Sequence, residues 1–269
     1  MLFRSVAARV SLYPIGLMGN LGRIKADPSF ANYIEMFTSP YFWESLTISA
    51  YYVFFSTGLS FLVGLGTALL LNQKFKGRRW ARLLVVLPWP VPGVIAALTF
   101  SWMFNSAFGV INYLLLKANL IAQPIHWFTS PGPALLAVIL ATAWKGYPFF
   151  TIMLIAGLQA IPGELYEAAR VDGANVFQQF RHVTLPALRS VIAVGMVISS
   201  LWAFREFGII HIMTAGGPAG ATQTLAITIY KEAFEFYSMG YASAVGMVTL
   251  GISMLVTVLF FRHLSKDFY

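Results

Sequence analysis

The sequence of 269 residues contains no cysteine, which excludes disulfide bonds, thiolate metal sites and cysteine nucleophiles. Its four histidines lack the spacing of a metal site, and no HExxH motif occurs. The phosphate-binding pattern GxxxxGK(S/T) is absent as well. If the protein uses ATP, another subunit must therefore hold the nucleotide, and we expect no cofactor or metal on this chain.

Charged residues are scarce, at 10% of the sequence, whereas hydrophobic residues make up 58% and the mean hydropathy is +0.71. This apolar share is well above that of a soluble globular domain. Short-period repeats and low-complexity linkers are also absent. The composition therefore predicts a single integral membrane domain over residues 1–269.

Apolar runs of about 20 residues match the length that a helix needs to cross a hydrocarbon core of about 30 Å. Because they lack the strict alternation of barrel strands, we expect an all-α fold, a polytopic transmembrane helical bundle. Five runs are long enough to span: Leu46–Leu71, Leu83–Phe104, Pro133–Leu158, Val191–Met213 and Ala242–Phe261. A sixth, Val10–Leu21, is too short. We therefore expect either a truncated first span or a start of the reading frame that is placed incorrectly. Arg9 interrupts any export signal there, so no cleaved signal is expected.

Lysine and arginine residues are distributed unequally between the two sides of these spans. Twelve of the eighteen fall in the N-terminus, two alternate loops and the tail: Arg4, Arg9, Lys74, Lys76, Arg78, Arg79, Arg82, Arg170, Arg181, Arg189, Arg262 and Lys266. Because basic residues accumulate in cytoplasmic loops, the segment around Arg170 and the C-terminus are predicted to be cytoplasmic. Their spread over separate loops argues against nucleic-acid binding.

A polar stretch, YEAARVDGANVFQQFRHVTLP at Tyr166–Pro186, interrupts the apolar sequence. Good helix-forming residues precede Gly173, and a second amphipathic run ends at Pro186. The pattern predicts two short helices joined at a glycine bend, with the chain turning back to the membrane at the proline. The small residues Ala168 and Ala169 suit insertion into a groove of a soluble partner. A helix pair lying on lipid headgroups fits the same pattern equally well.

The polar stretch resembles the EAA loop of binding-protein-dependent ABC importer permeases, written EAA-x3-G-x9-I-x-L-P. The matching residues are Glu167, Ala168, Ala169, Gly173, Val183, Leu185 and Pro186, with Val183 in place of the usual Ile. The segments LLVVLPWPVPGVIAALTFSWMF and AWKGYPFFTIMLIAGLQAIPGELYEAA are similar to the sugar-importer branch, particularly its MalF/UgpA-like subunits. The resemblance covers nearly the whole chain from about Tyr13 onward.

This resemblance implies a permease subunit of an ATP-driven importer in a bacterial or archaeal plasma membrane. Such a subunit works in membrane lipid with a second permease, two nucleotide-binding ATPase subunits and an extracytoplasmic solute-binding protein. The loop at about 159–190 would be the coupling segment that docks on an ATPase subunit. The two permeases would enclose the pathway for a sugar or a related solute. Members of this branch normally start with a complete first span, and the sequence departs from them there.

The second and third apolar runs contain residues that are unusual in a membrane helix. Pro88, Pro90 and Pro92 must weaken the hydrogen-bond ladder, which predicts a kinked or discontinuous helix that is either fixed by packing or a moving hinge. Lys145 lies near the middle of its span, where a charge needs a cavity, a partner or an extended path to the interface. For Lys145 we favour a structural role over contact with substrate.

Further candidates for the translocation pathway are charged or aromatic. Arg205 and Glu206 are adjacent, which on a helix places them about 100° apart, so each needs its own partner across the permease interface or in the pathway. Aromatic rings can stack against sugars, and this makes Trp102, Tyr147 and Trp202 candidates, although such side chains more often pack or face lipid.

Two other classes of protein fit the hydropathy. A stand-alone secondary transporter is the main alternative, and a membrane-bound enzyme comes last because no catalytic constellation is visible. The loop pattern favours the importer permease, so we expect a non-enzymatic subunit whose partners bind the ATP.

Overall fold

The computed structural model describes residues 2–13 and 27–265, and over these ranges its secondary structure is helical, with no strand. In chain order the elements are α1 (Leu2–Val10), α2 (Ala31–Thr38), α3 (Pro40–Asn72), α4 (Arg78–Val86), α5 (Gly93–Met103), α6 (Val110–Lys117), α7 (Pro131–Gln159), α8 (Gly163–Val171), α9 (Val176–Gln179), the π-helical turn η1 (Phe180–Thr184), α10 (Leu185–Phe204), α11 (Gly208–Thr214), α12 (Leu225–Tyr230), the π-helical turn η2 (Lys231–Glu235) and α13 (Met239–Ser265). The predicted all-α fold is confirmed.

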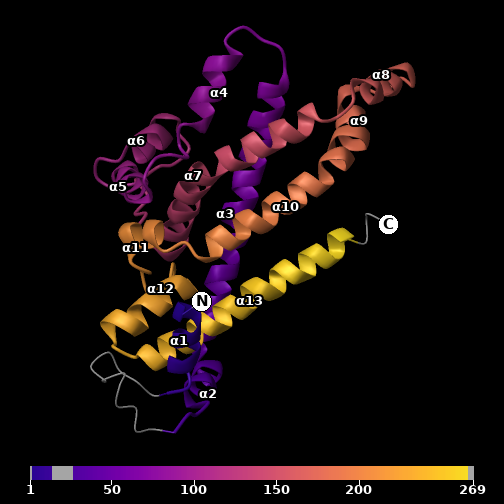
Figure 1. Cartoon of the computed structure of the whole chain (residues 1–269). Coiled ribbons are helices and arrows are strands. Elements are labelled where there is room, and N and C mark those ends of the chain that lie inside the picture. Colours follow the sequence, from indigo (N-terminus) through magenta and orange to yellow (C-terminus); the bar gives the residue numbers. More distant parts are fainter. Residues whose placement is uncertain (1, 14–26, 266–269) are drawn as a thin grey trace.

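Four helices among the described residues are long and apolar enough to cross a membrane. They are α3, α7, the continuous helix Val176–Phe204 that joins α9, η1 and α10, and the segment Met239–Val258 of α13. In Figure 1, α3, α7 and α10 lie against one another in the centre of the molecule. The short helices α8 and α9 project from one end, and α2, α12 and η2 gather at the other.

The longest helices begin with proline. Pro40 opens α3 after the extended residue Ser39, and Pro131 opens α7 after the extended residue Ser130. Proline suits the first turn of a helix because its φ is already helical and its missing N–H has no partner there. The two helix starts therefore follow from local sequence.

The pair α3 and α7 has the most extensive contact between helices. Small and hydroxyl-bearing side chains let the two backbones approach: Gly64 lies against Phe150, and the hydroxyls of Tyr52 and Thr142 are 2.8 Å apart. Small residues and interhelical hydrogen bonds are the usual means of holding helices together in lipid, where apolar side chains gain little by meeting one another. This pair is the frame against which the other helices pack.

The predicted span Leu83–Phe104 is two helices, neither of which is long enough to cross a membrane. The first half, α4, ends at Val86, and α5 begins only at Gly93. The residues between them contain three prolines, which cannot donate the amide hydrogen bonds of a continuous helix. The predicted discontinuity is confirmed, whereas the prediction of five complete spans is not.

The predicted span Val191–Met213 is also wrong at its C-terminal end. Helix α10 stops at Phe204, and the separate helix α11 starts at Gly208. The charged pair Arg205 and Glu206 falls in the break. Glu206 accepts a hydrogen bond from the backbone N–H of Ile209 at 2.9 Å, so its carboxylate satisfies an amide in the first turn of α11 that the helix itself leaves unpaired.

The other predicted spans agree with the structure. Leu46–Leu71 lies within α3, Pro133–Leu158 within α7, and Ala242–Phe261 within α13. The short apolar segment Val10–Leu21 starts at the last residue of α1, and most of it lies outside the described residues.

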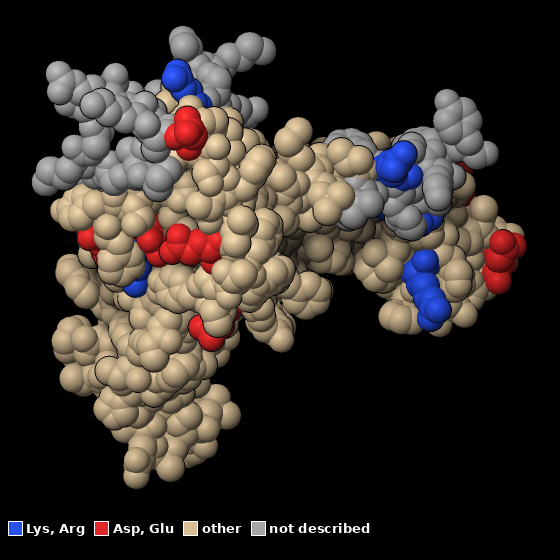
Figure 2. All heavy atoms as spheres, turned by 90° about the horizontal axis from the view of Figure 1, so that it is seen from below, with Lys and Arg blue, Asp and Glu red and all other residues tan. Residues whose placement is uncertain are grey.

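Carboxylates mark the end of the molecule formed by α2 and η2. Figure 2 views this end from below and shows Asp and Glu atoms in a row on a face that is otherwise mostly uncharged. Glu232 of η2 belongs to this end, and its partial burial, followed by the nearby carboxylate of Glu35 on α2, raises its pKa. This end therefore holds mutually repelling acidic groups.

Candidate functional site

The polar stretch forms the two short helices that the sequence predicts. Helix α8 ends at Val171, and the backbone then turns through Gly173, which has a φ of +81°. Helix α9 starts after Asn175, whose side chain accepts a hydrogen bond from the backbone of Gln178 while the Gln178 side chain accepts one from the backbone N–H of Asn175. This capping box and the left-handed glycine fix the bend between the helices.

The prediction that the second amphipathic helix ends at Pro186 is wrong. Residues Val176–Phe204 form one continuous helix, and Pro186 lies in the first turn of α10. The helix accommodates the proline because the preceding turn, η1, is π-helical, and the N–H of Leu185 reaches back to the carbonyl of Phe180. A π turn widens the helix, which relieves the clash that a proline ring makes with the carbonyl four residues earlier.

The residues of the EAA pattern fall into two groups in the structure. Glu167 and Ala168 are exposed on α8 and Ala169 is half-buried, so the first group lies on the projecting helix (Figure 1). Val183, Leu185 and Pro186 belong instead to η1 and the start of α10. The pattern therefore includes residues on the exposed helix α8 and residues at the start of the long helix α10.

Apolar side chains lie exposed around the bend. Val171 is 87% exposed, Val176 is 83% exposed and Phe177 is 68% exposed. Large apolar side chains that are clustered and accessible in this way mark an interaction surface. Val176 and Phe177 belong to the amphipathic run that the sequence predicts after Gly173, whereas Val171 was not singled out, although its position beside the bend was a usable signal.

A cavity of about 230 Å³ lies between α3, α7 and α10, near the middle of the first two helices. Its lining combines hydroxyl groups, aromatic rings and two charged side chains, and comprises Ser56, Thr57, Ser60, Trp89, Thr142, Lys145, Gly146, Phe149, Ser199, Trp202, Ala203, Glu206 and Ile209. Three predicted pathway residues, Lys145, Trp202 and Glu206, thus meet in one cavity although they come from separate parts of the chain.

Hydrogen bonds engage both charged groups of the cavity. The Lys145 ammonium donates to the carbonyl of Val91 at 2.6 Å and lies 3.4 Å from that of Trp89. Glu206 uses one carboxylate oxygen on the Ile209 amide. The buried hydroxyl of Thr57, by contrast, has no hydrogen-bond partner among the described residues. An unpaired buried hydroxyl is costly, and this one lies in the wall of a cavity that could admit a polar ligand.

Aromatic side chains form another part of the cavity wall. The rings of Phe149 and Trp202 meet edge to face with centroids 4.8 Å apart. Trp89 belongs to the proline-rich segment between α4 and α5. Trp89, Phe149 and the cavity hydroxyls were not among the residues predicted from the sequence, although the spacing of Ser56 and Ser60 by one helical turn inside an apolar run was a signal.

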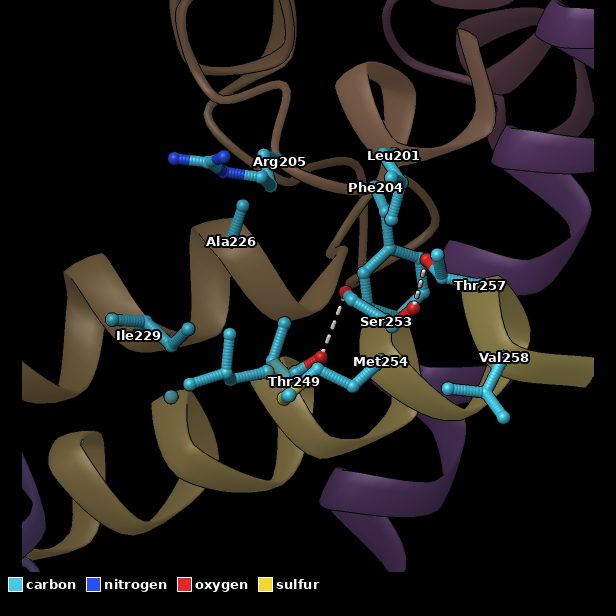
Figure 3. A pocket seen from close by; sticks show the side chains of 12 residues that line it. Leu201, Phe204, Arg205, Ala226, Ile229, Thr249, Ser253, Met254, Thr257 and Val258 are labelled. Carbon is cyan, nitrogen blue, oxygen red and sulfur yellow. Dashed lines mark hydrogen bonds between the residues drawn. The ribbon is translucent and has the colours of Figure 1, made fainter. Parts of the chain in front are cut away.

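The remaining pathway candidates lie elsewhere. Trp102 is 70% exposed on α5 and Tyr147 is half-buried on α7, and neither lines the cavity. Arg205 lines a different hollow, a groove of about 620 Å³ between α10, α12 and α13 (Figure 3). The two adjacent residues thus have different surroundings, although they lie in the break between α10 and α11 and not on one helix as the sequence predicts.

The groove beside Arg205 is mainly apolar. Figure 3 shows Thr249, Ser253 and Thr257 in succession along α13. Each of these hydroxyls donates to the carbonyl one turn earlier in α13, at 2.7 to 2.9 Å. The hydroxyl hydrogens are therefore used within the helix, and this surface offers a ligand few free donors.

Long apolar helices, a polar cavity near their middle and an exposed helix pair at one end are the features of a multi-pass membrane protein. Residues 60–268 match the family described as "Binding-protein-dependent transport system inner membrane component", and the chain belongs to this family. It is a permease subunit of a binding-protein-dependent importer, and the family is one of transport components.

Named relatives cover most of the chain. The trehalose/maltose transport system permease protein MalF of Thermococcus litoralis is 37% identical over 86% of this chain and 77% of the relative. The sulfoquinovosyl glycerol transport system permease protein SmoG of Agrobacterium fabrum is 38% identical over 88% of this chain and 77% of the relative. The resemblance inferred from the EAA pattern is therefore confirmed.

A solved structure shares the fold. It is a bacterial alginate ABC transporter in complex with an alginate pentasaccharide-bound periplasmic protein, and one of its chains is 25% identical to this protein with a TM-score of 0.77. The match covers 89% of this chain and 83% of that one.

Proposed function

We propose that this chain forms, together with a second permease, the pathway of an ATP-driven importer for a sugar or a related solute. The relatives described above are named for trehalose and maltose and for sulfoquinovosyl glycerol, and the structural neighbour is an alginate transporter. An extracytoplasmic binding protein would deliver the solute, and two ATPase subunits would hold the ATP. In this proposal residues 1–269 act as one integral membrane domain.

The cavity between α3, α7 and α10 carries the proposal. Hydroxyl groups and a carboxylate can exchange hydrogen bonds with sugar hydroxyls, and the faces of Trp89 and Trp202 can cover the apolar face of a sugar ring. The unpaired Thr57 hydroxyl would gain a partner from such a ligand. A position near the middle of two spans suits a site that opens to each side in turn.

The projecting helices α8 and α9 are the proposed ATPase docking site. The exposed Glu167 and Ala168, with Val171, Val176 and Phe177 beside the bend, offer a charge and an apolar surface to a groove of a soluble partner. The basic segment that includes Arg78 follows α3 at the same end of the molecule as α8 (Figure 1). This arrangement supports a cytoplasmic position for the docking segment and the C-terminus in an inner membrane.

Reconstitution of the complete importer in proteoliposomes tests the proposal. The ligand is first identified by a thermal-shift screen of sugars on the binding protein encoded with this chain, and ATP-dependent uptake is then measured with that sugar. Trp202→Ala should reduce uptake about tenfold, which corresponds to the loss of one aromatic contact with the sugar. The matched change Trp102→Ala, at an exposed site away from the cavity, should leave uptake within about twofold.

Two outcomes would contradict the proposal. Equal uptake by both tryptophan variants would show that the cavity is not part of the pathway. ATP hydrolysis by the isolated chain, with contaminating ATPases excluded, would contradict the assignment of ATP binding to its partners.

A further inference from the structure

The projecting helix α8 is tied to the long helix behind it by a side-chain hydrogen bond. The Tyr166 hydroxyl of α8 lies 2.9 Å from the Thr184 hydroxyl of η1. Either hydroxyl can be the donor, and the Thr184 hydroxyl also lies 3.5 Å from the carbonyl of Gln179. Thr184 is 4% exposed, so the bond is formed at the buried base of the projecting helices.

The position of Thr184 gives this bond a mechanical role. Thr184 is the last residue of the π turn and is followed directly by α10. Among the helical elements, η1 makes the main contact with α8. π-helical turns occur mostly as single turns inside α-helices, frequently at functional sites. Force applied to α8 therefore enters the long helix at its π turn.

Helix α10 carries this movement to the cavity. Ser199 and Trp202 of α10 line the cavity, and Glu206 follows the end of the helix. From Thr184 to Trp202 the helix extends about 27 Å, at about 1.5 Å per residue. A change in the angle of α10 at its base would displace these side chains while the α3–α7 pair stays in place.

We propose that the Tyr166–Thr184 hydrogen bond is the element that makes α10 follow the docking helix, so that Tyr166 and Thr184 are positioning residues for energy coupling. The inference rests on the proposed function of α8 as the ATPase docking helix. Neither hydroxyl needs to touch the ATPase or the sugar. The bond holds α8 against the π turn. Without it, α8 is joined to α10 only through the short bend before Val176 and through α9, so less of its movement reaches α10.

Conservative variants isolate the bond. Tyr166→Phe and Thr184→Val each remove a hydroxyl and keep the shape of the side chain, whereas Thr184→Ser keeps a hydroxyl. Tyr113→Phe, at an exposed tyrosine on α6, is the matched control. Because the chain contains no cysteine, spin labels can be placed on Leu62→Cys in α3 and Val194→Cys in α10, both exposed outside the cavity.

The assembled importer, with cysteine-free partner subunits, is measured by electron–electron double resonance before and after trapping with ATP and vanadate. In the parent protein, ATP should change the α3–α10 distance. Tyr166→Phe and Thr184→Val should each reduce the fraction of complexes that make this change about 3- to 10-fold, the range set by one hydrogen bond. The double variant should be no worse than either single variant, because both remove the same bond. Thr184→Ser and Tyr113→Phe should behave like the parent, and all variants should retain the ATPase subunits on purification.

The outcomes separate the inference from the function on which it rests. A full ATP-dependent distance change in both Tyr166→Phe and Thr184→Val would overturn the inference and leave the docking role intact. Loss of the ATPase subunits from these variants would also overturn it, because the bond would then serve docking rather than transmission. If the parent importer retains its ATPase but shows no ATP-dependent change in the α3–α10 distance, the inference fails, and the uptake assay still tests the proposed function. If the parent importer does not retain its ATPase, the proposed function fails and the inference fails with it.

Discussion

The ammonium group of Lys145 on α7 lies 2.6 Å from the carbonyl oxygen of Val91, in the segment where prolines interrupt the neighbouring helix. A broken helix leaves carbonyls without amide partners, and a lysine inside a membrane span needs groups that solvate its charge. The carbonyl of Val91 therefore solvates the Lys145 charge, and the ammonium group gives that carbonyl a hydrogen-bond donor. This bond holds the proline-rich segment so that Trp89 lies beside the cavity.

Replacing Lys145 by Met, which has a side chain of similar length, should lower the stability of the importer. The variant loses the charged donor to the carbonyls of Val91 and Trp89, and we expect a loss of about 1–3 kcal/mol of stability. Thermal unfolding of the purified complex measures the loss. Lys117→Met, at a lysine that lies over the ring of Tyr113 on α6, is the control and should change stability by less than about 0.5 kcal/mol. Equal unfolding temperatures for the two variants would show that the bond to Val91 contributes little.

Gly64→Ala should separate α3 from α7. An added Cβ would lie against Phe150 and only 3.0 Å from the backbone carbonyl of Tyr147, where no flexible side chain can give way. Such overpacking destabilises by about 1–3 kcal/mol. Gly66→Ala is the matched control two residues away, because an added Cβ there meets nothing within 4 Å and alanine favours the helix. A normal thermal midpoint for Gly64→Ala would mean that the two helices pack less closely than described.

Gly173→Val should uncouple the docking segment from uptake and leave the membrane helices inserted. The backbone φ of +81° is unfavourable for a β-branched residue even though space for the side chain is open. Gly163→Val is the control, since Gly163 has open space and no positive φ. Copurification of the ATPase and sugar uptake are measured together for both variants. If Gly173→Val retains both at the level of the control, the left-handed bend is not needed for coupling.

Glu232→Gln should stabilise the importer at neutral pH and not in acid. Burial, and then Glu35, raise the pKa of Glu232 in the folded protein above its ordinary value of 4.5. The ionised carboxylate is thus less favourable in the folded state, and the stability available below pH 4.5 is lost as the pH rises through the raised pKa. Thermal midpoints should therefore favour the Gln variant at pH 7–8 and converge with the parent near pH 4. Glu35→Gln should give a smaller gain of the same sign, and a pH-independent difference for Glu232→Gln would contradict this account.

The sequence was sufficient for features that depend on neighbouring residues. Apolar run length placed α3, α7 and α13, because a membrane helix satisfies its own backbone hydrogen bonds and needs only an apolar surface. Proline chemistry predicted the break between α4 and α5, and Gly173 marked the bend between α8 and α9. Local rules failed at Pro186, where the π turn η1 allows the helix to continue through the proline.

The composition of the cavity depended on tertiary structure. Lys145, Trp202 and Glu206 share it because Gly64 lets α3 approach α7 and because α10 then packs across both helices. Arg205, adjacent to Glu206 in the chain, lies instead in the groove beside α13. In a chain with so many aromatic residues, composition could not distinguish Trp202, which lines the cavity, from Trp102, which does not. A contact between distant helices depends on how their surfaces fit, and hydropathy and spacing along one helix contain no information about that fit.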